Sequence, residues 1–240
     1  LPDTEVMVAR DNAGTTDGFF VAAKGGHNDE SHNHKDIGNF VVYYDGLPLL
    51  IDVGRGTYTR KTFSDRRYEI WYNRSDYHNV PTINNSTQMP GAEFKADKVT
   101  YTRGKGHAEF ALDMAKAYPG EAGVNSWKRT IRLNRGKNVQ ITDVAALTSA
   151  SSVTQHLMTS SHSEIIKPGE VMMHYLGENG EQKDFVLKYD ARALEASVEK
   201  IPLTAKEDQG ILTKWGDTIY RINLKSISPV RSPRYVLEVV

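Results

Sequence analysis

Residues 39–54 read NFVVYYDGLPLLIDVG, and this stretch decides the fold that we predict. Two apolar runs, 39–44 and 49–52, stand on either side of Asp45-Gly46, a dipeptide typical of the tight turn between antiparallel strands. Such short apolar runs bounded by Gly, Asn, Asp and Pro are typical of β-strands. We therefore expect a β-hairpin here, with the two outer ends of its strands close together.

Working outward from this hairpin, short runs of the same kind recur along the whole chain. They cover residues 5–9, 18–23, 98–103, 107–114, 127–134, 138–145, 152–158, 171–176, 184–189, 219–224 and 235–239. Turn residues at 134–136, 177–180 and 215–217 separate some of them. We also expect a short helix over 64–71 and a helical turn over 191–196. The pattern predicts an all-β fold, a large antiparallel β-sandwich with few short helices, as a single domain over residues 1–240.

The composition excludes several classes of protein. Lys plus Arg and Asp plus Glu number 30 each, so the formal net charge is zero and we expect no nucleic-acid partner. No apolar run is long enough for a membrane span, and we expect no membrane partner. Cysteine is absent, which excludes disulfides, thiolate catalysis and cysteine-ligated zinc.

A cluster of histidines precedes the hairpin. His27, His32 and His34 fall within eight residues, and in an extended chain His32 and His34 would point to the same side. The hairpin brings His34 and Asp52 to one end, and His78 lies in a long loop expected at that end. Two histidines, one carboxylate and an open position fit zinc, although Mn²⁺, Fe²⁺ or Ni²⁺ would accept the same ligands. The alternative is that these are ordinary loop side chains.

These motifs together resemble a known family. The string from His32 to Phe40, then Asp45-Gly46 and residues 50–54, then Tyr58, Arg66 and His78-Asn79, resembles the C-terminal β-sandwich of heparinase II/III-like polysaccharide lyases. The resemblance covers residues 1–145 well and the remainder only by its strand rhythm. Members of that family join an N-terminal α/α toroid to this sandwich and cleave uronic-acid-containing glycans by β-elimination.

The resemblance implies roles for individual residues. His34, Asp52 and His78 match the metal ligands, usually for zinc, and His32 matches a histidine that faces the substrate. Tyr68 is the candidate for a catalytic tyrosine, with Tyr58 and Tyr72 as alternatives. It also implies a periplasmic or secreted protein, an acidic polysaccharide as substrate and an upstream toroid as partner domain. Because no toroid stands within these 240 residues, we expect this domain alone to be inactive or very weakly active.

The loop after the hairpin is rich in basic and aromatic residues. Between residues 55 and 74 there are six Lys or Arg side chains and only two acids, an excess that suits a glycan carrying carboxylates or sulfates. Tyrosines interleave with these bases and could stack on sugar rings. The residues that we predict to bind substrate are Arg66, Arg67, Tyr58 and Asn79. A solvated basic loop is the alternative.

Two other functions compete with a lyase. Gly26 followed by His32-Asn33-His34 fits the first half of a cupin motif, and a cupin-type metalloenzyme would use both histidines as ligands. The glutamate expected after the second histidine is missing, since Gly38 and Asn39 stand there. A non-catalytic carbohydrate-binding module is the second alternative, and it would not need His32.

Overall fold

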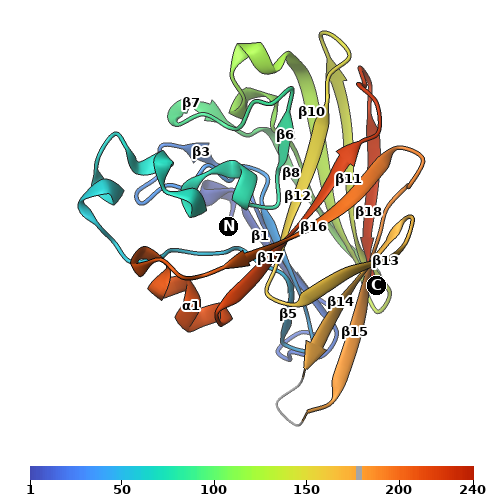
Figure 1. The fold of residues 1–240 in the computed structure, drawn as a ribbon. Coiled ribbons are helices and arrows are strands. Elements are labelled where there is room, and N and C mark those ends of the chain that lie inside the picture. The colour runs from blue at the N-terminus through green and yellow to red at the C-terminus, as the bar shows by residue number, and fades with distance from the viewer. Residues whose placement is uncertain (177–179) are drawn as a thin grey trace.

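Two layers of antiparallel strands face each other across one large apolar core in the computed structural model, which describes residues 1–176 and 180–240 (Figure 1). The turn expected at 177–180 thus lies mostly outside the described residues. The all-β fold class predicted from the sequence is confirmed. No helix in the described part of the chain is long and apolar enough to cross a membrane.

The first layer is one eight-stranded sheet in the order β13-β14-β15-β18-β11-β10-β9-β8. Its strands are β8 (Asp97–Gly104), β9 (His107–Asp113), β10 (Val124–Asn134), β11 (Asn138–Leu147), β13 (His162–Lys167), β14 (Glu170–Leu176), β15 (Gln182–Lys188) and β18 (Arg234–Val239). Burial alternates along β10, so that every second side chain enters the core. This alternation is the pattern by which the sequence predicted the strand.

The second layer combines two four-stranded sheets, in the orders β1-β2-β4-β5 and β16-β17-β12-β6. Their strands are β1 (Val6–Arg10), β2 (Phe19–Lys24), β4 (Phe40–Tyr44), β5 (Leu47–Leu50), β6 (Pro81–Ile83), β12 (Val153–Thr159), β16 (Leu194–Pro202) and β17 (Thr218–Ser226). The amide of Ile51, just after β5, donates to the carbonyl of Met158 at 2.8 Å and joins the two sheets. A two-stranded pair, β3 (His27–Asn28) with β7 (Gly91–Lys95), lies beside them.

The helices are short. They are η1 (Pro2–Thr4), η2 (Arg60–Phe63), η3 (Arg67–Glu69), η4 (Trp71–Asn73), η5 (Ser75–Tyr77), η6 (Ala115–Ala117), η7 (Gly120–Ala122), η8 (Lys206–Asp208) and α1 (Gln209–Trp215). The helix expected over 64–71 is only the single 3-10 turn η3. The helical turn expected over 191–196 is wrong, because a turn at 191–193 leads into β16, which pairs with β17 from Leu194 onward.

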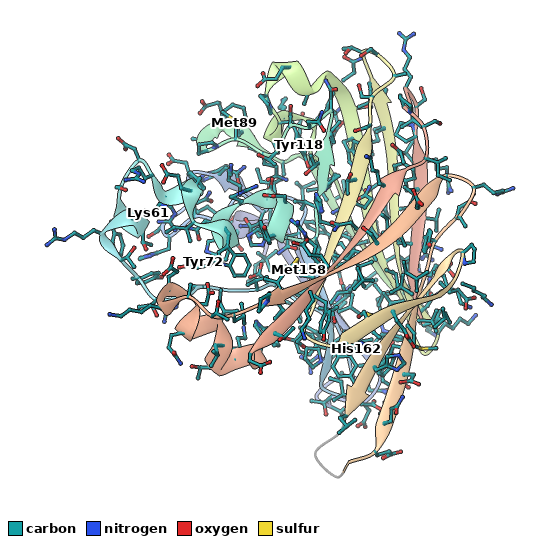
Figure 2. All side chains as sticks on the ribbon, in the orientation of Figure 1. Lys61, Tyr72, Met89, Tyr118, Met158 and His162 are labelled. Atoms are coloured by element: carbon teal, nitrogen blue, oxygen red, sulfur yellow. The ribbon has the colours of Figure 1, made fainter. Side chains whose placement is uncertain are left out.

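A second, smaller core holds η4, η5 and α1 against β12 and β17. Its members include Ile51, Tyr72, Met158, Ile211 and Ile219, all buried. Figure 2 labels Tyr72 and Met158, the first on the helical loop and the second on β12. The helical loop before β6, which carries most of the candidate site residues, is thus held in place by apolar contacts with this second core.

Candidate metal centre and active site

His78 and Asp52 form the centre of the candidate site. Asp52 stands two residues after β5, and His78 directly follows η5. His78 Nδ1 lies 3.2 Å from Asp52 Oδ2. The His78 side chain is fully buried, and its Nε2 has no hydrogen-bond partner in the described part of the chain. Because two ligand atoms that share a tetrahedral zinc are about 3.4 Å apart, the 3.2 Å separation suits a metal as well as a hydrogen bond.

Backbone and amide groups fix the Asp52 carboxylate. Asn39 Nδ2 donates to Oδ2 at 2.6 Å, and the amide of Gly54 donates to Oδ1 at 2.7 Å. The side-chain Oδ1 of Asn39 in turn accepts from the backbone amide of Asn79 at 2.9 Å. Asn39 therefore connects the Asp52 side chain to the backbone next to His78, in the way that neighbours of metal ligands orient them.

His34 and Asp36 complete the cluster. The ring centroids of His34 and His78 are 5.3 Å apart. Asp36, Asp52 and His78 each offer a ligand atom, and these atoms lie within 4.8 Å of one another. The structure thus brings together the ligand atoms of Asp52 and His78 with those of Asp36, which the sequence analysis missed, and places the His34 ring beside His78. An acid two residues after His34 is the signal that could have indicated it.

The pKa values of Asp52, His78 and His34 depend on one another and on burial. Burial by itself raises the pKa of Asp52, but the charge of His78 and its hydrogen bond outweigh burial and hold the pKa of this carboxyl well below its usual range. Burial by itself lowers the pKa of His78, but Asp52 outweighs it and raises that pKa. Burial, helped by the charge of His78, lowers the pKa of His34 to about 4, so its imidazole is neutral at pH 7. A neutral imidazole is the form that binds metal.

His32 lies apart from this cluster. Its φ of 57° is in the left-handed region, which residues other than glycine adopt rarely. The exposed ring stacks on Tyr58, with centroids 5.4 Å apart and planes 19° from parallel, and stands edge-on to Phe63 at 6.0 Å. The expectation that His32 and His34 point to one side is therefore wrong, because the backbone is turned at His32 instead of extended.

The three candidate tyrosines differ in exposure. Tyr58 is 38% exposed and in contact with His32. Tyr68 is half-buried, accepts a hydrogen bond from Asn33 Nδ2 at 3.0 Å and lies with its ring 5.1 Å from the Lys35 ammonium. Tyr72 is 1% exposed and its hydroxyl is buried. Tyr58 and Tyr68 can reach a substrate from these positions, whereas Tyr72 cannot.

The predicted substrate-binding residues have mixed surroundings. Arg66 holds Glu69 through two hydrogen bonds of 2.9 and 2.8 Å at the surface. Arg67 supports the loop by donating to the carbonyls of Asn33 and Thr62.

Asn79 is completely buried, which changes the role that we predicted for it. Its side chain donates to the carbonyls of Phe40 and Ile51 and accepts from the amide of Met158. It therefore cannot contact a glycan, and it serves to tie β4, the end of β5 and β12 together.

Comparison with known protein families identifies the family of this chain. The family model described as heparinase II/III-like, C-terminal, matches residues 1–198. The chain belongs to this family. Membership excludes the cupin alternative, and the separation of His32 from the cluster agrees with that result. A search of curated proteins finds no match.

Solved structures show the same fold as this heparinase II/III-like domain. The crystal structure of heparinase III matches 99% of the chain with a TM-score of 0.72 and 15% identity, over 35% of its own length. The heparan sulfate lyase HepC of Pedobacter heparinus matches 92% with a TM-score of 0.69 and 14% identity, over 32% of its length. The chain thus spans about a third of the length of these proteins.

Proposed function

We propose that this domain supplies the metal-binding part of the active site of a polysaccharide lyase, which cleaves uronic-acid-containing glycans by β-elimination. The observation that carries the proposal is the turn at His32. It separates one exposed imidazole on an aromatic surface from the half-buried His34 and Asp52 and the buried His78. The loop therefore exposes His32 for proton transfer, while the metal ligands on its inner side hold the loop in place.

This group fits a divalent cation, and we propose zinc held by His34, Asp52 and His78. The donors are nitrogen and oxygen, and His78 Nδ1 lies 3.2 Å from Asp52 Oδ2, a separation that suits two ligands of one ion. Asp36 is the less favourable third ligand, since its Oδ1 already accepts from the Lys24 ammonium at 2.9 Å. When bound, the cation would fix the His32 loop rather than contact sugar.

Elimination requires three functions from the protein. A base removes the proton at C5 of the uronate, a donor neutralises its carboxylate, and an acid protonates the glycosidic oxygen as the C4–O bond breaks and a C4–C5 double bond forms. We assign the proton transfers to His32 and Tyr68. Tyr58 orients the His32 ring by stacking, and exposed Phe63 extends the apolar surface for a sugar.

The proposal includes a second domain. These solved lyase structures are about three times as long as this chain, which supports an upstream α/α toroid that supplies further catalytic groups. An acidic polysaccharide is the proposed substrate, and a periplasmic or secreted location follows from the same resemblance. We expect the domain without the toroid to be inactive.

The test is turnover by the full-length protein on heparan sulfate and other uronans, followed by the ultraviolet absorbance of the unsaturated product. We expect His32→Ala to lower the turnover rate about 100-fold or more with unchanged glycan affinity. His27→Ala, an exposed histidine of the same segment, is the matched control. Absence of elimination on every acidic glycan would exclude a lyase. A small change in affinity alone for His32→Ala would favour a carbohydrate-binding module.

A further inference from the structure

We propose that a pocket between residues 54–58 and α1 binds an anionic substituent, sulfate or carboxylate, of the sugar next to the one at His32. This inference rests on the proposed function and concerns residues outside its proton-transfer machinery. The pocket has a volume of about 550 Å³, within the range of small-ligand sites. Arg55 and Tyr58 line one side, and Gly210 and Lys214 of α1 line the other.

The pocket carries positive charge that the protein does not neutralise. Its lining holds two cations, Arg55 and Lys214, and no Asp or Glu. Neither cation has a carboxylate within ion-pair distance in the described part of the chain. Each instead lies over an aromatic ring, Arg55 at 4.8 Å from Tyr58 and Lys214 at 4.6 Å from Trp215.

Several other cations of the same region are paired, whereas Arg60 has no ion pair and Arg67 donates to backbone carbonyls among the described residues. Lys61 and Arg66 share Glu69, and Arg74 contacts Asp76 at 2.6 Å. Arg55 and Lys214 thus line one pocket as two positive charges without a carboxylate partner. Such a pair of cations can bind an oxyanion.

Close backbone packing forms the pocket in advance of any ligand. The amide of Thr57 donates to the carbonyl of Glu207 at 2.7 Å, and Trp215 Nε1 donates to the carbonyl of Val53 at 3.0 Å. A Cβ at Gly56 would lie 2.1 Å from the Glu207 carbonyl oxygen, and one at Gly210 would lie 2.9 Å from that of Arg55. The two glycines therefore let α1 bring Lys214 to the loop that carries Arg55.

Tyr58 connects this pocket to the proposed catalytic histidine. Its ring stacks on His32 and also lies beneath the Arg55 guanidinium. An anion held by Arg55 is therefore separated from His32 by one aromatic ring, which suits a substituent of the adjacent sugar. The pocket would select glycans by the acidic group at that position.

The test compares two octasaccharides with the full-length protein by equilibrium binding. Heparosan carries only carboxylates, and heparin carries carboxylates and sulfates. We expect the double variant Arg55→Gln and Lys214→Gln to weaken binding at least 10-fold. A loss confined to heparin would identify sulfate, and a loss with both would identify carboxylate. The matched control, Arg103→Gln and Lys105→Gln, removes the same charges from residues outside the pocket lining and should change affinity less than 2-fold.

Titration with inorganic sulfate, followed by the NMR amide signals of Gly54 and Gly56, gives a readout that needs no catalysis. We expect these signals to shift in the wild type and not in the double variant. Equal octasaccharide affinity of the double variant and its control, or no sulfate shift at these amides, would overturn the inference even if the protein is a lyase. Binding at these cations without any elimination would instead overturn only the proposed function.

Discussion

The position of the Asp52 side chain is fixed by its hydrogen-bond partners. An acid directly after three apolar residues is costly to bury alone, and the structure gives it Asn39, His78 and the amide of Gly54. The sequence predicted that His34 and Asp52 approach each other, because a hairpin brings strand ends together, and that His78 comes from the long loop at the same end. It could not predict the left-handed backbone at His32, which depends on packing against Tyr58 and Phe63.

The burial of His156 leads to a prediction of how the stability of the protein depends on pH. Burial lowers its pKa from 6.5 to about 4. Its Nδ1 bonds Asn223 Oδ1 at 2.7 Å, and its Nε2 bonds the Thr82 hydroxyl at 2.8 Å, which suits the neutral ring. Below pH 6.5 the His156 ring is protonated in the unfolded chain, whereas in the folded chain it stays neutral down to about pH 4. The free energy of unfolding therefore falls as the pH is lowered over that range, by at most roughly 3 kcal/mol for this residue.

The measurement is urea unfolding between pH 7 and pH 4 on the wild type and His156→Gln. We expect a shallower pH dependence in the variant, with a remainder from His34, whose pKa is also lowered. Identical pH dependence of the two proteins would refute this assignment.

At the scale of elements, strong alternation made strands predictable. All thirteen expected strands are present, with bounds shifted by a few residues. The missed strands lack the signal for a physical reason: β7, β13 and β16 are mostly exposed on both faces, and β3 and β6 are two and three residues long. Helix α1 has only seven residues, and its apolar side becomes recognisable only against the second core.

The contact between α1 and the loop after β5 leads to a second prediction. Gly56→Ala would place a methyl group 2.1 Å from the Glu207 carbonyl oxygen and 2.7 Å from the Tyr72 ring. We expect a loss of about 2 kcal/mol or more in the free energy of unfolding, because backbone must move. The control Gly106→Ala meets nothing within 4 Å and should be nearly neutral. Urea unfolding of both variants measures the difference, and equal stability would contradict the packing described here.

In the molecule as a whole, a buried hydrogen-bond network around one arginine joins the two layers. Arg129 on β10 forms two hydrogen bonds with Asp143 on β11, of 2.8 and 2.7 Å, and both side chains are almost fully buried. The remaining Arg129 donors reach Gln155 and the carbonyls of Gly38 and Asn79. The backbone next to His78 is thus fixed to the eight-stranded sheet. The sequence predicted both strands but not this network, since inward-facing Arg and Asp contradict the usual pattern.

We expect Arg129→Met to cost about 3–5 kcal/mol of stability, because it leaves Asp143 buried without its partner. The matched control is Arg132→Met on the same strand, whose pair with Glu109 is partly exposed and should cost about 1 kcal/mol or less. Denaturant unfolding distinguishes the two. Similar losses for both variants would show that the network does not connect the layers as we describe.

If a divalent cation anchors the loop that presents His32, elemental analysis of the purified full-length protein will find it. We predict about one zinc ion per chain in the wild type, its loss in His78→Ala and Asp52→Asn, and its retention in His174→Ala, a surface histidine outside the site. A wild-type protein that binds no metal, or His78→Ala and Asp52→Asn variants that keep it, would contradict the account.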